Sequence, residues 1–223
     1  GISFEVRAGE IVGLAGLIGA GRTDLAMTIF GAGHKVRGET IVVGQEVDIT
    51  SPEVAIDAGL GYVPEDRKLQ GLFLSMALRS NITAASINEL TNRFGFVHQN
   101  KESEMADYFI RALGIRTPSM EQQARNLSGG NQQQVVLAKW MAVNPKVLIM
   151  DEPTRGVDVG AKAKIYALMH EMVERGMAII MISSELPEVL AMSDRIVIMR
   201  EGKYAGTLDI ADADEEKIMA YAT

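Results

Sequence analysis

The sequence contains no cysteine, which excludes disulfide frameworks, thiolate zinc sites and thiol nucleophiles. Aromatic residues are scarce, at 5%, while methionine is plentiful at 13 residues, so we expect methionine to fill much of the core. The sequence also lacks any block of five or six like charges, and its formal net charge is −7. An acidic chain without a basic stripe disfavours nucleic acid as a partner.

Long apolar runs are absent as well. No stretch approaches the roughly 18 to 20 apolar residues needed to cross a bilayer, so we expect any contact with a membrane to be peripheral and made through partners. The 223 residues are enough for one large α/β domain or two small lobes. The chain starts abruptly, without an initiator methionine, in a segment (Ile2–Val6) whose pattern predicts a strand. We therefore expect it to be a piece of a longer polypeptide.

A glycine-rich loop is the most informative feature that is present. Residues 16–23, GLIGAGRT, match the phosphate-binding pattern G-x-x-x-x-G-K-[S/T] except that Arg22 replaces lysine. The loop lies between an apolar run (10–15) that predicts a buried strand and a predicted helix (23–30). Its backbone N–H groups and the helix N-terminus suit phosphate, and the Thr23 hydroxyl suits Mg²⁺. A glycine-rich strand-to-helix turn without a ligand is the alternative. The candidate nucleotide-binding residues are Gly16, Leu17, Ile18, Gly19, Ala20, Gly21, Arg22, Thr23 and Asp24.

Two acids follow the predicted buried strand at residues 147–150. Chemistry in open α/β sheets takes place at the carboxyl ends of strands. Asp151 is a candidate Mg²⁺ ligand, and Glu152 is a candidate catalytic residue that polarises an attacking water. Two solvated acids at a strand end remain the alternative, which the upstream glycine loop makes less favourable.

A third motif, LSGGNQQ at residues 127–133, begins another predicted helix. A serine hydroxyl, glycine amides and a helix N-terminus make a second anion site. One chain cannot easily fold both sites onto the same phosphate. The motifs therefore predict a head-to-tail pair in which each partner lends this segment to the other's loop. The residues concerned are Leu127, Ser128, Gly129, Gly130 and Asn131.

The remaining pattern predicts an α/β arrangement. A hairpin is expected around Gly44-Gln45, a mostly helical region over about 72–142, a parallel strand at 178–182, an amphipathic helix at 161–175 and a late hairpin at 195–203. Within the helical region, helices are expected at 81–90, 101–113 and 131–143.

In its motifs and their order the chain resembles the nucleotide-binding domains of ABC transporters over essentially its whole length. The matching segments are Walker A (16–23), signature (127–131), Walker B (147–152) and D-loop (155–158, with Asp158). The resemblance implies a P-loop (RecA-like) NTPase core with an antiparallel β subdomain and a helical ABC-type subdomain inserted at about 72–142, all in one ATP-binding domain, 1–223. It also implies ATP and Mg²⁺ as cofactors, with Thr23 and Asp151 at the metal.

The segments GAGRT, PEDRK, LSGGNQQ and DEPTRGVDVGAK further resemble the C-terminal half of bacterial monosaccharide-importer ATPases, which serve ribose, arabinose, xylose and galactose. The implied partners are an N-terminal ABC half of the same polypeptide, membrane permease subunits and, indirectly, a periplasmic sugar-binding protein. Nucleic acid is not among them. The implied location is the cytoplasmic face of the bacterial inner membrane. A soluble, non-transport ABC ATPase acting on DNA or ribosomes is an alternative, but the sequence lacks the coiled-coil insertions or basic arms that such proteins usually need.

Three positions depart from the pattern of this family. Arg22 stands in place of the Walker lysine, Glu65 in place of the Q-loop glutamine and Ser184 in place of the switch histidine. Arginine is a longer planar fork than lysine, and serine is too short to carry charge to a γ-phosphate. Losing one positioned catalytic group typically removes about 10²–10⁴ in rate. We therefore predict a degenerate, regulatory Walker site in this half and an intact signature that completes the other half's hydrolytic site. A non-hydrolysing nucleotide-binding module is the remaining alternative.

Overall fold

The computed structural model describes residues 1–223. The chain forms two compact units. The sheet unit comprises residues 1–62, 145–153 and 169–223, and the helical unit comprises residues 63–144 and 154–168.

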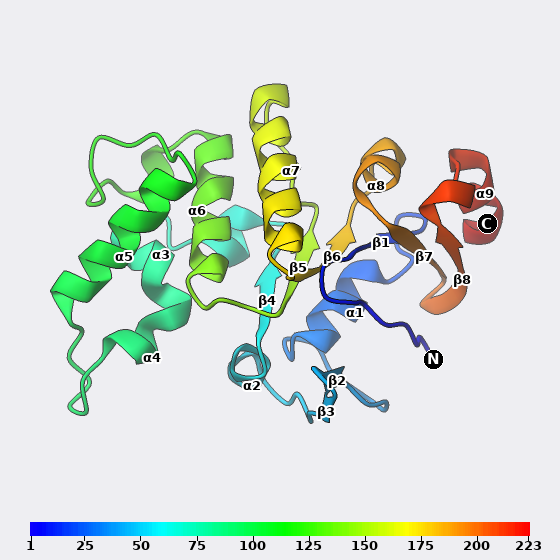
Figure 1. The fold of residues 1–223 in the computed structure, drawn as a ribbon, viewed down its shortest axis with the longest axis horizontal. Helices are drawn as coiled ribbons and strands as arrows, with labels where there is room; N and C mark the ends of the chain where they lie inside the picture. The colour runs from blue at the N-terminus through cyan, green and yellow to red at the C-terminus, as the bar shows by residue number, and fades with distance from the viewer. The chain divides into compact units, whose positions relative to one another are not determined.

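A six-stranded sheet in the order β4-β5-β6-β1-β7-β8 is the centre of the sheet unit (Figure 1). Strand β1 pairs in parallel with both β6 and β7, β5 pairs in parallel with β6, and β8 is antiparallel to β7. Every residue of β1 and β6 is buried, which explains their uninterrupted apolar sequences. The strands are β1 (Ile11–Ala15), β4 (Leu60–Val63), β5 (Val147–Asp151), β6 (Ala178–Ile182), β7 (Arg195–Arg200) and β8 (Lys203–Asp209).

Helices α1 (Arg22–Ile29) and α8 (Leu186–Met192) cover opposite faces of this sheet (Figure 1). Helix α8 contacts β1, and a Cβ at Gly13 of that strand would lie only 2.3 Å from Ser193 Oγ and 2.8 Å from Val189 Cγ1. Glycine at this strand position therefore lets the helix approach the sheet closely. The remaining elements of the unit are β2 (Ile41–Val42), β3 (Gln45–Glu46), α2 (Pro52–Asp57), η4 (Ile210–Asp212) and α9 (Glu215–Ala222).

The expected elements of the sheet unit form, with one exception. The hairpin at Gly44 is confirmed as the antiparallel pair β2–β3, and the late hairpin is confirmed as β7–β8. The prediction of a strand at Ile2–Val6 is wrong, because this segment is irregular backbone. Both neighbours of β1 are already other strands, so the segment has no free place beside it in the sheet.

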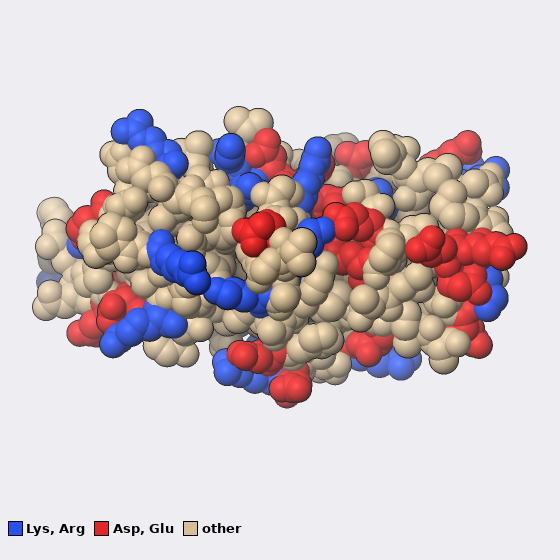
Figure 2. Space-filling view, turned by 90° about the horizontal axis from the view of Figure 1, so that it is seen from above, with Lys and Arg blue, Asp and Glu red and all other residues tan.

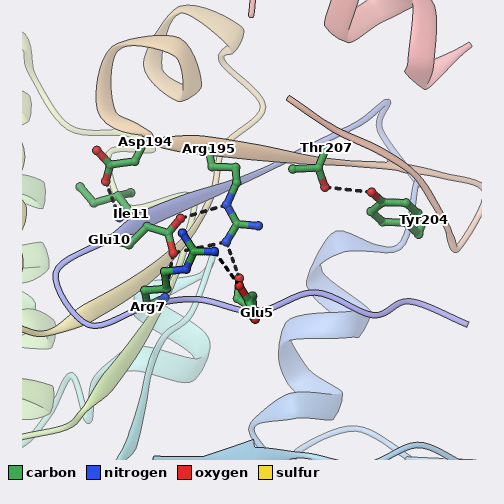
Figure 3. A network of polar contacts seen from close by, with 8 residues as sticks. All are labelled: Glu5, Arg7, Glu10, Ile11, Asp194, Arg195, Tyr204 and Thr207. Carbon is green, nitrogen blue, oxygen red and sulfur yellow. Dashed lines mark hydrogen bonds and ion pairs between the residues drawn. The ribbon is translucent and has the colours of Figure 1, made fainter. Parts of the chain in front are cut away.

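Arginine contacts hold that N-terminal segment instead (Figure 3). Arg195, at the start of β7, donates to the Glu5 carbonyl oxygen at 2.8 Å and to the Glu10 carboxylate at 2.9 Å. The backbone N–H of Ile11 donates to Asp194 Oδ2 at 2.8 Å. Within Ile2–Val6 the Glu5 carbonyl thus accepts from an arginine side chain and not from a neighbouring strand.

Exposed acidic side chains gather around α9, where they occupy the helix start and the turn before it. Figure 2 shows this concentration over the end of the face that carries α9. Such a surface repels polyanions. The residues are Asp212, Asp214, Glu215 and Glu216.

The helical unit is built on α6 (Gly129–Met141), whose residues from Gln132 to Trp140 are all buried. Helices α3 and α5 pack against it. Buried glutamines on α6 satisfy loop carbonyls: Gln132 donates to Ala124 O at 3.1 Å and Gln134 to Leu113 O at 2.8 Å. The predicted helices at 101–113 and 131–143 are confirmed with shifted ends, whereas the one predicted at 81–90 is divided into two short helices with a 3-10 turn between them. The elements are η1 (Arg67–Gly71), α3 (Leu78–Thr83), η2 (Ala84–Ser86), α4 (Ile87–Leu90), α5 (Gln99–Ala112), η3 (Ala124–Asn126) and the first part of α7 (Val159–Glu174).

None of the helices combines the length and the apolar character that a bilayer-crossing segment requires.

Lys139 of α6 is a buried cation, 8% exposed, whose ammonium donates to Gly71 O at 2.7 Å. Burial lowers its pKa from 10.5 to about 8. Between these two values the folded chain has released the proton while the unfolded chain still holds it, so stability rises with pH through this window. From pH 7 to pH 9.5 we expect wild type to gain about 2 kcal/mol of unfolding free energy relative to Lys139→Met, measured by urea unfolding. An equal difference between the two proteins at both pH values would contradict this.

Candidate functional site

The glycine loop joins the carboxyl end of β1 to the N-terminus of α1. Gly19 and Gly21 have φ of +83° and +87°, a conformation that favours glycine. Within the loop Ala20 N donates to Leu17 O at 2.9 Å, and from outside it Gly202 N donates to Ala20 O at 3.0 Å. Ile18 is 94% exposed, and Asp24 is exposed in the first turn of α1. The loop therefore has the strand–loop–helix setting that the phosphate-binding motif requires.

Arg22, the residue that replaces the motif lysine, is buried, whereas Leu17, Ile18 and Gly19 of the same loop are exposed. One guanidinium nitrogen donates to the backbone carbonyl of Ser183 at 2.7 Å, just beyond the end of β6. Burial lowers the pKa of Arg22, although the charges of Glu152 and Asp151 raise it. Part of the donor capacity of this side chain is thus used inside the protein.

Asp151 ends β5 and is completely buried. The Tyr62 hydroxyl donates to its Oδ2 at 3.2 Å, and its Oδ1 has no hydrogen-bond partner. Burial raises the pKa of Asp151, while the nearby Thr23 and Tyr62 hydroxyls and the charge of Arg22 lower it. A buried carboxylate oxygen without a partner is rare in folded proteins, and here it belongs to the side chain predicted to bind a cation.

Glu152, the next residue, has φ of +50°, which is uncommon outside glycine. Its backbone N–H donates to Ile182 O at 2.9 Å, and its Oε2 accepts a bond from the Ser184 hydroxyl at 3.2 Å. Burial raises the pKa of Glu152, against the Ser184 hydrogen bond and the Arg22 charge, which lower it. The predicted catalytic residue and the switch-position residue therefore contact each other directly.

A second set of contacts fixes the segment after β6. The hydroxyl of Ser183, which is buried, donates to Glu188 Oε2, and Glu185 N donates to Ser183 Oγ at 3.0 Å. The carbonyl that receives Arg22 is thus part of an anchored turn.

In the helical unit, the signature motif forms the start of α6. Ser128 is exposed and its Oγ accepts a bond from Asn131 Nδ2 at 3.0 Å. Asn131 Oδ1 in turn accepts from Arg116 N at 2.9 Å. Gly130 is buried and a Cβ there would lie 2.8 Å from the Ala161 side chain. The motif therefore presents its serine at the N-terminus of a 13-residue helix.

The Q-loop position and the D-loop also lie in the helical unit. Glu65 forms an ion pair with Arg155. Arg67 donates to the Arg155 carbonyl at 2.8 Å. Asp158 Oδ1 accepts from Ala161 N at 3.0 Å in the first turn of α7. The two predicted residues of this region, Glu65 and Asp158, thus have structural partners of their own.

Tyr62 contributes to the site although it belongs to none of the sequence motifs. Tyr62 sits in the four-residue strand β4 (LGYV) immediately before Pro64-Glu65. Its apolar neighbours were a detectable strand signal, but a partner 89 positions away on the chain leaves no local trace.

The sheet unit's residues fit a nucleotide phosphate accompanied by Mg²⁺. The Asp151 Oδ1 oxygen lacks a protein partner, Thr23 lies next to this carboxylate, and the loop is open at Gly19, where a Cβ would meet no atom within 4 Å. No group of three or more His, Asp or Glu residues gathers that could hold a metal ion. A cation at Asp151 therefore needs further oxygen ligands, and phosphate oxygens are suitable ones.

Comparison with known proteins identifies the same family as the sequence motifs. A family model described as "ABC transporter" matches residues 1–155. The chain is 51% identical over 221 residues to the ribose import ATP-binding protein RbsA of Clostridium tetani, covering 99% of this chain and 44% of that protein. It is 50% identical over 224 residues to the xylose import ATP-binding protein XylG of Thermoanaerobacter pseudethanolicus, covering 100% and 44%. The chain thus spans less than half the length of these relatives.

A solved structure described as a nucleotide-free ATP-binding cassette from an ABC transporter matches the fold. Its TM-score is 0.81 at 22% sequence identity, and the match covers 99% of this chain and 87% of that chain. This likeness confirms the mixed α/β cassette fold.

Proposed function

Because this chain belongs to the ABC transporter family, we propose that it is an ATP-binding, energy-coupling half of a carbohydrate importer. In this proposal residues 1–223 form one ABC domain, with a helical subdomain at about 72–142, inside a longer polypeptide of two such halves. ATP binds at residues 16–24, and Mg²⁺ is held by Thr23 and Asp151. When bound, Mg²⁺ neutralises phosphate oxygen charge.

One observation carries the nucleotide proposal: Asp151, fully buried beside the glycine loop, keeps a carboxylate oxygen without a protein partner. Leaving such a group unsatisfied costs free energy in the isolated chain. Mg²⁺ held by Asp151 together with phosphate oxygens would remove that cost. The backbone N–H groups of residues 16–23 and the N-terminus of α1 supply the matching attraction for phosphate.

The substrate class rests on the two relatives that are named as ribose and xylose import ATP-binding proteins, at 51% and 50% identity. Since they are more than twice as long as the aligned region, a preceding nucleotide-binding half is the natural head-to-tail partner. Membrane permease subunits would receive the motion of the two halves, and a periplasmic sugar-binding protein would act on those subunits. The chain would then lie peripherally on the cytoplasmic face of the inner membrane.

We further propose that this half's own Walker site is regulatory. Arg22 donates to Ser183 O inside the protein, Ser184 is a neutral donor to Glu152, and Glu65 is paired with Arg155. None of these arrangements offers the γ-phosphate the compact cation or the imidazole that hydrolysis in this family uses. The signature residues, including Ser128, Gly129 and Gly130, would act on the other half's nucleotide.

The test is nucleotide turnover by this chain. With ATP and Mg²⁺, calorimetry should detect binding, and phosphate release should stay far below the roughly 10 s⁻¹ of a typical enzyme. Combining Arg22→Lys with Ser184→His should raise the turnover at least tenfold, because it restores two positioned groups.

Adding Glu152→Gln to this combination is the control, and it should erase the gain. Turnover of several per second by the unmodified chain would reject the regulatory assignment. Absence of ATP binding in the presence of Mg²⁺, with the preceding half restored, would reject the nucleotide proposal itself.

A further inference from the structure

Tyr62 is a buried tyrosine whose hydroxyl reaches the predicted metal ligand. It lies on β4 and is only 7% exposed. Its ring packs against Phe30, at the end of α1, with ring centroids 5.4 Å apart and an interplanar angle of 31°. Strand and helix thus hold the ring from two sides, and the hydroxyl has little freedom to move.

The hydroxyl is bonded to one particular oxygen. Tyr62 donates to Asp151 Oδ2 at 3.2 Å, because an ionised carboxylate can only accept. The other oxygen, Oδ1, is buried without a partner. A carboxylate with two unbonded oxygens can rotate about its terminal torsion, whereas a hydrogen bond to Oδ2 resists that rotation and distinguishes the two oxygens.

We infer that Tyr62 is a positioning residue, whose hydroxyl fixes the Asp151 carboxylate so that Oδ1 is kept for the divalent cation that accompanies the nucleotide. This inference rests on the proposed binding of ATP with Mg²⁺. Hydrogen-bond partners of metal ligands commonly account for about 10–100-fold in metal affinity. Asp151 has no solvent exposure, so water cannot easily replace the lost hydroxyl.

Tyr62→Phe removes the hydroxyl and keeps the ring that packs on Phe30. The measurement is Mn²⁺ affinity in the presence of a non-hydrolysable ATP analogue, with free Mn²⁺ counted by electron paramagnetic resonance. We expect the variant to bind Mn²⁺ about tenfold more weakly. Its affinity for the analogue in EDTA should match that of wild type, since the glycine loop is untouched.

Two further variants complete the experiment. Tyr204→Phe removes a hydroxyl whose hydrogen-bond partner is Thr207 Oγ1, at 3.0 Å, and not Asp151 (Figure 3), and should leave Mn²⁺ affinity unchanged. Phe30→Leu keeps the Tyr62 hydroxyl but loosens its ring. It should weaken Mn²⁺ binding by less than Tyr62→Phe does, and it provides a second test if Tyr62→Phe folds poorly.

The outcomes separate this inference from the function on which it rests. If wild type binds no nucleotide, the proposed function fails. If wild type binds the analogue with Mn²⁺, and Tyr62→Phe and Phe30→Leu both bind Mn²⁺ as tightly as wild type does, the positioning role is overturned and the proposed function stands. If Tyr62→Phe loses affinity for the ATP analogue equally in EDTA and in Mn²⁺, Tyr62 has a merely structural role and the inference is also overturned.

Discussion

Replacing Ser128 by arginine is expected to stop most ATP hydrolysis in the polypeptide that joins this chain to a preceding nucleotide-binding half. We expect kcat to fall by about 10²–10³, the usual cost of losing one preorganised donor at a site of developing charge. Ser128 is exposed at the N-terminus of α6, where hydroxyl, glycine amides and helix dipole converge. Arginine removes the hydroxyl and fills the space that the other half's phosphate would occupy. Phosphate release under saturating ATP measures the effect.

Ser119→Arg is the matched control, because Ser119 is an exposed serine of the same unit outside the motif, and it should leave kcat as in wild type. Glu152→Gln should lower kcat far less than Ser128→Arg, since this half's own site is proposed to be regulatory. If Glu152→Gln proved the more damaging of the two, hydrolysis would occur at this half's own loop, and the division of roles proposed here would be reversed.

Gly16→Ala is expected to weaken ATP binding by up to about a hundredfold. A Cβ at position 16 would lie 2.4 Å from the Met199 carbonyl oxygen and 3.0 Å from the Ala20 Cβ. Because Met199 belongs to β7, its carbonyl cannot move without disturbing the sheet, so the loop must shift. Overpacking of this kind typically costs about 1–3 kcal/mol, and about 2.8 kcal/mol corresponds to a hundredfold in affinity. Calorimetric titration with ATP and Mg²⁺ measures the change.

Gly176→Ala provides the control for backbone strain. Gly176 has φ of +88° and a Cβ there would meet no atom within 4 Å, so alanine introduces strain without a clash. This variant should lower Tm modestly and leave the ATP affinity unchanged. Wild-type ATP affinity in Gly16→Ala would show that the contact with β7 does not control the shape of the loop.

Periodicity and motif spacing predicted the strands and helices correctly wherever the local signal is strong. The apolar run at 178–182 is β6 with the same ends, and the glycine loop has the expected strand and helix on either side. Short helices such as α2 and α8 were not predicted, because six or seven residues carry too little periodic signal. Ile2–Val6 has a strand pattern, but pairing is decided by the places left in the sheet, which the pattern of one segment cannot reveal.

For this protein the sequence by itself determined the family, the phosphate loop and the two acids after β5, since each is encoded by residues close together on the chain. Only the tertiary structure decided how Arg22, Ser184 and Tyr62 are used. Arg22 meets Ser183 across 161 positions, Ser184 meets Glu152 across 32, and Tyr62 meets Asp151 across 89. Contacts of this kind arise when parallel strands bring their carboxyl ends to one edge, and no local pattern records which side chains then share a hydrogen bond.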